Sequence, residues 1–183
     1  MTQQEAADLT IYAAPVGIFC ISPGDCCDDE GSPPVSLFLN RRGNLVQLWD
    51  DRTNPDNQWR SSVYGGQTCF SLQNMRTGLF LRVREGCADL GIRPDLEQLP
   101  EQLDPSFTWQ ILQWKNKDTY VLRNVASQTY LNVAGGRMHY GNKVHMWDNP
   151  DEDDSQWSFE AAPNETVAER SANLLGLLDA EEF

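Results

Sequence analysis

The chain repeats one pattern three times, at intervals of nearly 50 residues. Trp59, Trp109 and Trp157 follow one another at spacings of 50 and 48 residues. The segment 46–50 (VQLWD) recurs 98 residues later as 144–148 (VHMWD), and both segments continue to a Gln-Trp pair. A period of this length marks a repeat architecture, in which one unit cannot bury its apolar face without the others. We therefore expect the three units to fold together.

The units, which cover about residues 16–61, 67–112 and 119–159, consist of short segments typical of β-strands. Apolar and polar residues alternate in runs of four to six, as in 119–123 (TYVLR) and 129–133 (TYLNV). This alternation is the period of a half-buried strand, and turn residues such as Gly, Asn and Asp separate the runs. Four such strands in each of three units predict an all-β structure that closes on itself, because closure leaves no strand edge exposed.

Composition limits the function of the chain. Its 183 residues include 14 basic and 27 acidic side chains, for a net charge of −13. Such a charge repels the phosphate backbone of nucleic acids and favours a neutral or cationic ligand. No apolar run reaches the roughly 18–20 residues of a membrane span. Residues 1–8 contain no Lys or Arg, so no secretory signal is expected and the predicted location is cytoplasmic.

The sequence predicts no metal site, no cofactor and no catalytic centre. The five cysteines are odd in number and show no C-x2-C spacing, so we expect reduced thiols and no zinc. The acidic segment 148–154 (DNPDEDD) lacks the central Gly of an EF-hand loop, and we interpret it as a solvated loop. Catalytic motifs such as G-x-S-x-G and H-E-x-x-H do not occur, which predicts a protein that is not an enzyme.

The V-x-[LM]-W-D and Q-W motifs resemble those of the ricin B-chain-like, or R-type, lectin domains. The third unit carries the likeness best, from residue 130 (YLNVAGGRMHYGNKVHMW) to its Q-W pair. The resemblance implies a β-trefoil over residues 16–162, a six-stranded barrel capped by three hairpins, with the Q-W tryptophans in its core. Residues 1–15 would form a tail. Residues 163–183 would form an acidic amphipathic tail, whose apolar spacing predicts a short helix over 165–178.

In this lectin family, the Trp of V-x-x-W covers the apolar face of a sugar, and polar side chains bind the hydroxyls. One polar residue lies fifteen positions before the Trp, and another is the Asn of an Asn-Gln pair, here replaced by Asp. The residues of the third unit at these positions are Trp147, Asn132 and Asp154. His145 is added to them because it stands two residues before Trp147 and would project from the same face of the strand. Those of the first unit are Trp49, Asn40, Asp56 and Gln47. The second unit has Arg82 at the polar position and no matching Trp, so we expect no site there.

The leading hypothesis is a non-catalytic carbohydrate-binding module. It would bind a glycan, for example of the galactose type, through the third unit and also the first. Packing against a hairpin is the alternative role of Trp49 and Trp147. A second hypothesis is a structural or interaction subunit that docks on a protein partner through the tail 163–183. A third is an inhibitor that uses the insertion 89–105, which replaces the V-x-x-W-D segment of the second unit.

Overall fold

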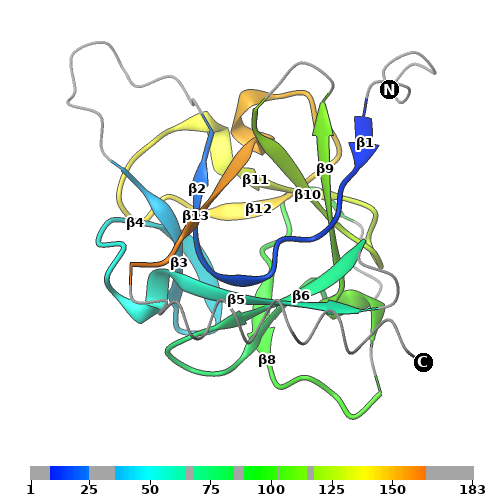
Figure 1. Cartoon of the computed structure of the whole chain (residues 1–183). Coiled ribbons are helices and arrows are strands. Elements are labelled where there is room, and N and C mark those ends of the chain that lie inside the picture. Colours follow the sequence, from blue (N-terminus) through cyan, green and yellow to red (C-terminus); the bar gives the residue numbers. More distant parts are fainter. Residues whose placement is uncertain are drawn as a thin grey trace.

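Six antiparallel strands close into a barrel in the computed structural model, which describes residues 9–24, 36–64, 68–84, 89–102, 104–114 and 118–163 (Figure 1). The barrel strands, in order around the barrel, are β2 (Gly17–Pro23), β5 (Gln58–Tyr64), β6 (Cys69–Asn74), β9 (Trp109–Trp114), β10 (Tyr120–Asn124) and β13 (Trp157–Ala161). Each pairs with the next, and β13 pairs back onto β2. The sheet therefore has no open edge between its first and last barrel strands.

Three two-stranded hairpins complete the fold. They are β3 (Phe38–Arg42) with β4 (Leu45–Trp49), β7 (Phe80–Arg82) with β8 (Asp95–Glu97), and β11 (Tyr130–Val133) with β12 (Val144–Trp147). Each repeat thus supplies two barrel strands and one hairpin between them, which confirms the predicted all-β, β-trefoil architecture. The short strand β1 (Leu9–Ile11), in the segment that the sequence analysis assigned to a tail, pairs with β9.

The three repeated tryptophans form the centre of the core. Trp59, Trp109 and Trp157 have no exposed surface, and they belong to one apolar cluster that all three repeats build. Each indole N–H donates to a hairpin carbonyl of its own repeat, namely Leu39 (2.8 Å), Leu81 (3.0 Å) and Leu131 (2.9 Å). The sequence period therefore identified the core correctly.

A short 3-10 turn precedes each of these tryptophans. The three turns are η2 (Pro55–Asn57), η3 (Pro105–Phe107) and η5 (Asp153–Ser155). The first two begin at an Asn or Asp cap, since the side chains of Asn54 and Asp104 accept from the backbone N–H two residues on. Proline follows each cap, where its fixed φ suits the first turn of a helix. These turns carry side chains that contact the hairpins.

The three hairpins are joined to one another through backbone pairing. The N–H of Leu48, Leu96 and Met146 donates to the carbonyl of Asn142, Asn44 and Ile92, respectively, in a different repeat each time. Immediately before each acceptor stands a glycine with positive φ: Gly141 (75°), Gly43 (63°) and Gly91 (81°). Residues with a Cβ rarely adopt this conformation, so these positions need glycine. The connections thereby place one repeat's loop beside the next repeat's hairpin.

The predicted C-terminal helix over 165–178 lies outside the described residues. Among the described cysteines, Cys20 and Cys69 are free. No helix in the described part of the chain is long and apolar enough to cross a membrane. Within the same ranges, no group of three or more His, Cys, Asp or Glu side chains could hold a metal ion.

Replacing Trp109 by Phe removes the indole N–H that satisfies the Leu81 carbonyl and leaves a void among buried side chains. We expect the free energy of unfolding to fall by about 2–4 kcal/mol. Trp49→Phe is the matched control, because Trp49 is 38% exposed, and we expect a change below about 0.5 kcal/mol. Urea unfolding followed by fluorescence measures both variants. Equal losses of stability would contradict the assignment of Trp109 to the core.

Candidate functional site

In the third repeat, strand β12 presents two aromatic side chains on its outer face. His145 and Trp147 alternate with the buried Val144 and Met146, so both project away from the core. Their rings are nearly parallel, with an angle of 9° between the planes and 5.5 Å between the centroids. Both side chains are partly exposed. The strand period thus stacks the imidazole of His145 against one face of the Trp147 indole on the outer side of the hairpin.

A chain of hydrogen bonds runs from this surface to the turn η5. His145 Nε2 lies 2.6 Å from Asn132 Oδ1, and Asn132 Nδ2 donates to Asp154 Oδ1 (2.9 Å) and Ser155 Oγ (3.0 Å). Ser155 Oγ in turn donates to the carbonyl of Asn149 (2.9 Å). The structure therefore brings together all four residues that the sequence analysis selected in the third repeat.

The network also defines the direction of each bond. The carboxylate of Asp154 only accepts, so the group that faces it must be the amide NH2 of Asn132. Asn132 Oδ1 is then the acceptor for His145, which requires a proton on Nε2. Neutral His145 is left with Nδ1 as an acceptor, and Asp154 keeps a second oxygen, Oδ2. A polar ligand could bond to both atoms.

Burial affects the two ionisable groups of this network in opposite directions. It lowers the pKa of His145 below 6.5, because the cation is the form that burial penalises. Burial raises the pKa of Asp154 above 3.8, although the hydrogen bond from Asn132 acts in the other direction. Near neutral pH the site therefore contains a neutral imidazole beside a carboxylate.

Two glycines border the same groups. A Cβ on Gly91, which belongs to the second repeat, would lie 3.9 Å from His145 Nδ1. A Cβ on Gly136, in the turn η4 (Ala134–Gly136), would lie 3.6 Å from Asp154 Oδ2. Both glycines have positive φ, and neither places a side chain over the acceptor atoms. Backbone without a side chain thus borders His145 Nδ1 and Asp154 Oδ2, while, in addition to burial, Glu152 lies close enough to Asp154 to raise its pKa.

The first repeat forms a similar chain around Asn40, with Gln47 in place of His145 and Asn57 in place of Ser155. Gln47 Nε2 donates to Asn40 Oδ1 (3.1 Å), and Asn40 Nδ2 donates to Asn57 Oδ1 (2.7 Å). The predicted Asp56 instead accepts from Arg41 Nε (2.7 Å) and has Arg76 Nε at 3.8 Å. Asn40, Gln47 and Asn57 therefore cluster, whereas Asp56 pairs with cations.

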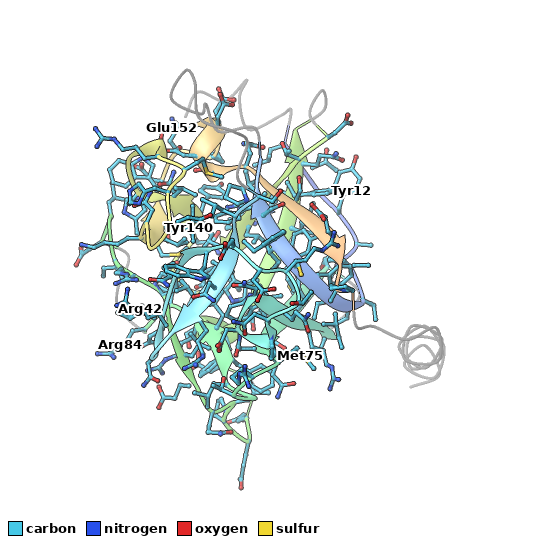
Figure 2. All side chains as sticks on the ribbon, turned by 90° about the vertical axis from the view of Figure 1, so that its left-hand side faces the viewer. Tyr12, Arg42, Met75, Arg84, Tyr140 and Glu152 are labelled. Atoms are coloured by element: carbon cyan, nitrogen blue, oxygen red, sulfur yellow. The ribbon has the colours of Figure 1, made fainter. Side chains whose placement is uncertain are left out.

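Trp49 of the first repeat has an aromatic neighbour from another repeat. The ring of Tyr140 lies 5.4 Å from that of Trp49, at an angle of 50°. Tyr140 comes from the connection of the third repeat that pairs with β4, and it is 52% exposed. Figure 2 shows Tyr140 and Arg42 on the same side of the molecule. Trp49 therefore contacts an aromatic ring of the third repeat.

Ion pairs occupy the corresponding positions of the second repeat. By strand register, Asp95 faces Arg82 as His145 faces Asn132, and Glu97 faces Phe80 as Trp147 faces Tyr130. The guanidinium of Arg82 pairs with Asp95 (2.9 Å) and Glu97. It also lies over the ring of Phe107, with 5.5 Å between Cζ and the ring centroid. The second repeat thus has a carboxylate, Glu97, where the third has Trp147, a correspondence that the strand register reveals.

The sequence analysis missed Asn57, Ser155 and Tyr140. Asn57 and Ser155 stand two residues before a core Trp, next to the residues that were selected, so the repeat alignment could have found them. No pattern within one repeat pointed to Tyr140, because its contact depends on a connection that crosses to another hairpin. Contacts between repeats were therefore the part of the site least accessible to sequence analysis.

Comparison with known proteins supports the fold and the resemblance. The model of the family described as ricin-type beta-trefoil lectin domain-like matches residues 105–181. The resemblance to ricin-type β-trefoil lectins is confirmed. The ricin B-like lectin of Macrolepiota procera, solved in complex with lactose, superposes with a TM-score of 0.63 at 16% identity over 82% of this chain and 99% of that one.

Two further structures show the same fold. The Polyporus squamosus lectin, bound to a sialylated trisaccharide epitope, has a TM-score of 0.64 at 16% identity and covers 82% of this chain and 50% of that one. An exo-β-1,3-galactanase from Clostridium thermocellum has a TM-score of 0.65 at 12% identity, over 82% of this chain and 31% of that one. No curated protein sequence matches the chain.

The lowered pKa of His145 predicts a pH dependence of stability. Folding disfavours the cation, so the contribution of His145 is complete above pH 6.5 and is lost as the pH falls from there towards its folded pKa. His145→Gln keeps the donor to Asn132, as Gln47 shows in the first repeat, but cannot take a proton. We expect the stability difference, wild type minus variant, to be smaller at pH 5.5 than at pH 7.5.

Urea unfolding of both proteins across this pH range measures the difference. Asp154 acts with the opposite sign and lower on the pH scale, since its raised pKa costs stability as the pH rises above 3.8. Parallel stability curves for the wild type and His145→Gln between pH 7.5 and 5.5 would contradict the assignment.

Proposed function

We propose that the protein is a non-catalytic carbohydrate-binding module whose principal site is in the third repeat. The observation that carries the proposal is the continuous arrangement of Trp147, His145, Asn132 and Asp154 on one hairpin and the turn below it. Aromatic rings match the C–H face of a pyranose, and fixed polar groups match its hydroxyls. The lectins with this fold support the same function.

In this proposal, the sugar packs on the indole of Trp147 and bonds to the free acceptors. Asp154 Oδ2 and His145 Nδ1 accept from hydroxyl groups, while Asn132 holds both residues in place through its own hydrogen bonds. The inner bonds are made before the ligand arrives, so binding does not have to order these side chains. A surface of this kind covers only part of a sugar, so we expect a low affinity for a single sugar unit. Binding through a second site would raise the avidity.

The first repeat is the proposed second site. It retains an indole and a polar amide chain, but its carboxylate is engaged by Arg41 and its indole by Tyr140. A neutral sugar would therefore find fewer free acceptors there than in the third repeat. The second repeat is not proposed to bind sugar, since ion pairs fill the corresponding positions.

A protein-interaction subunit is the second candidate function. The observation in its favour is that Trp49 and Tyr140 expose 38% and 52% of their surface next to each other. Aromatic side chains of this size are enriched in protein interfaces. In this case the pair would contact a protein rather than a sugar. The proposed partner contact of residues 163–183 concerns a segment of which the structure describes only residue 163.

Trp147→Ala separates the two functions. We expect selective binding on an array of neutral glycans, including terminal galactose, and a loss of at least about tenfold in affinity in the variant, because the apolar platform is removed. Trp49→Ala is the matched control, since it deletes the same side chain from the first repeat. It should lower the stoichiometry in calorimetry, with the affinity of the third repeat unchanged. Near-UV circular dichroism confirms folding of both variants.

Full glycan binding by folded Trp147→Ala would contradict the site. An array without any binding, with wild-type protein folded, would contradict the lectin function and favour the interaction subunit.

A further inference from the structure

The hairpins differ in charge from the rest of the molecule. The chain has a net charge of −13, but its three hairpin segments, residues 38–49, 80–97 and 130–147, contain seven basic and only four acidic side chains. Two of the three segments contain no acidic residue at all. A prediction from net charge alone therefore does not apply to this part of the surface, because nearby charges dominate the potential that a small ligand experiences.

Arg93 is partly buried in this region and incompletely bonded. Its Nη2 donates to the carbonyl of Val46 (2.6 Å), which belongs to the first repeat. Its Nε is buried and has no hydrogen-bond partner. Burying an N–H without a partner is unfavourable, so Arg93 is held at this position at a cost in stability.

Arg42 adds a second positive charge. Arg93 bonds the carbonyl of Val46, and Arg42 approaches the side chain of the next residue, Gln47, so both guanidinium groups lie against the same part of β4. Burial lowers the pKa of Arg93, and the positive charge of Arg42 lowers it further. Arg42 is exposed, and its Nη1 lies 3.5 Å from Gln47 Oε1. Two like charges without a counterion repel each other, and a bound anion would remove that repulsion.

The nearby carboxylates do not neutralise this pair. Both oxygens of Asp95 are occupied, Oδ1 by Arg82 and Oδ2 by Arg84, each at 2.9 Å. Throughout the described ranges, neither Arg42 nor Arg93 forms an ion pair with a carboxylate. Arg82 and Arg84 thus have counterions within the protein, whereas Arg42 and Arg93 do not.

Lys143 lies at the edge of the same region. It forms an isolated bridge with Gln47, the residue that Arg42 approaches, and its side chain is exposed. The three cations come from three repeats, which meet here through their backbone pairing. The fold therefore assembles the cluster, and no single repeat contains it.

We propose that Arg42 and Arg93, with Lys143 at the edge, form a binding site for an oxyanion such as a sulfate, phosphate or carboxylate group. Guanidinium groups match oxyanions through paired N–H donors, and within the described ranges neither Arg42 nor Arg93 has a carboxylate counterion. The anion has two possible sources, a free inorganic ion or the acidic group of a glycan. Lys143 and Trp147 are four residues apart on one strand face, about 13 Å. An acidic oligosaccharide bound at Trp147 could therefore reach the cluster.

Titration with sodium sulfate at constant ionic strength tests the site, with the arginine Nε–H signals followed by NMR. We expect a saturable shift of the Arg93 signal in the wild type. Arg42→Gln, at an exposed position that should not affect folding, should weaken the binding at least about tenfold. Arg60→Gln is the matched control, because Arg60 lies on barrel strand β5, away from the cluster, and binding should remain unchanged.

A second experiment identifies the source of the anion. It compares the binding of a sulfated tetrasaccharide with that of its desulfated form. Tighter binding of the sulfated form, lost in Arg42→Gln, identifies an acidic glycan. Saturable binding of sulfate with equal affinity for both tetrasaccharides identifies a free anion. A linear, non-saturating response of Arg93 to sulfate, or equal effects of Arg42→Gln and Arg60→Gln, would overturn the proposal. Neither result depends on whether neutral sugars bind at Trp147.

Discussion

One hydrogen bond, made three times, determines where every candidate site residue lies. In each repeat, the indole N–H of the tryptophan at or next to the start of the second barrel strand donates to a hairpin carbonyl, over 2.8–3.0 Å. Those carbonyls belong to Leu39, Leu81 and Leu131, and the next residues are Asn40, Arg82 and Asn132. A buried indole N–H without an acceptor is costly, so this bond holds the hairpin against the barrel. The polar residue that follows is thereby held above the 3-10 turn.

The frame is shared by all repeats, but the chemistry built on it differs. Two residues before each tryptophan stand Asn57, Phe107 and Ser155. Asn57 and Ser155 accept from the asparagine above them, whereas Phe107 lies below the guanidinium of Arg82. Neutral amides leave a network open to hydroxyl groups, but an arginine held by two carboxylates has its donors occupied. Different residues at corresponding positions of the three repeats therefore separate the candidate sites of the first and third repeats from the ion pairs of the second, without any change in fold.

The sequence predicted the frame better than the contacts made on it. The tryptophan period and the strand alternation were sufficient for a closed all-β structure of three repeats, and the resemblance to R-type lectins added the β-trefoil with the tryptophans in its core. The same resemblance selected Asn132, Trp147 and Asp154, and strand alternation added His145; the structure finds the four connected. Asp56 was expected in the same role as Asp154 but pairs with Arg41, the residue after Asn40. The direction in which a surface carboxylate points depends on such local cations, and spacing between motifs does not encode them.

Contacts between repeats explain why the altered second repeat still matters for the third. The insertion of the second repeat lies along β12. There the backbone groups of Gly91 and Ile92 pair with those of Met146, the residue between His145 and Trp147. Gly91 borders the free nitrogen of His145, and Arg93 follows two residues later with an unpaired donor. The second repeat has lost the aromatic residue of its own hairpin, but its connection shapes the surface beside Trp147. Changes in residues 89–94 can therefore alter the third repeat's surroundings while all of its own residues stay the same.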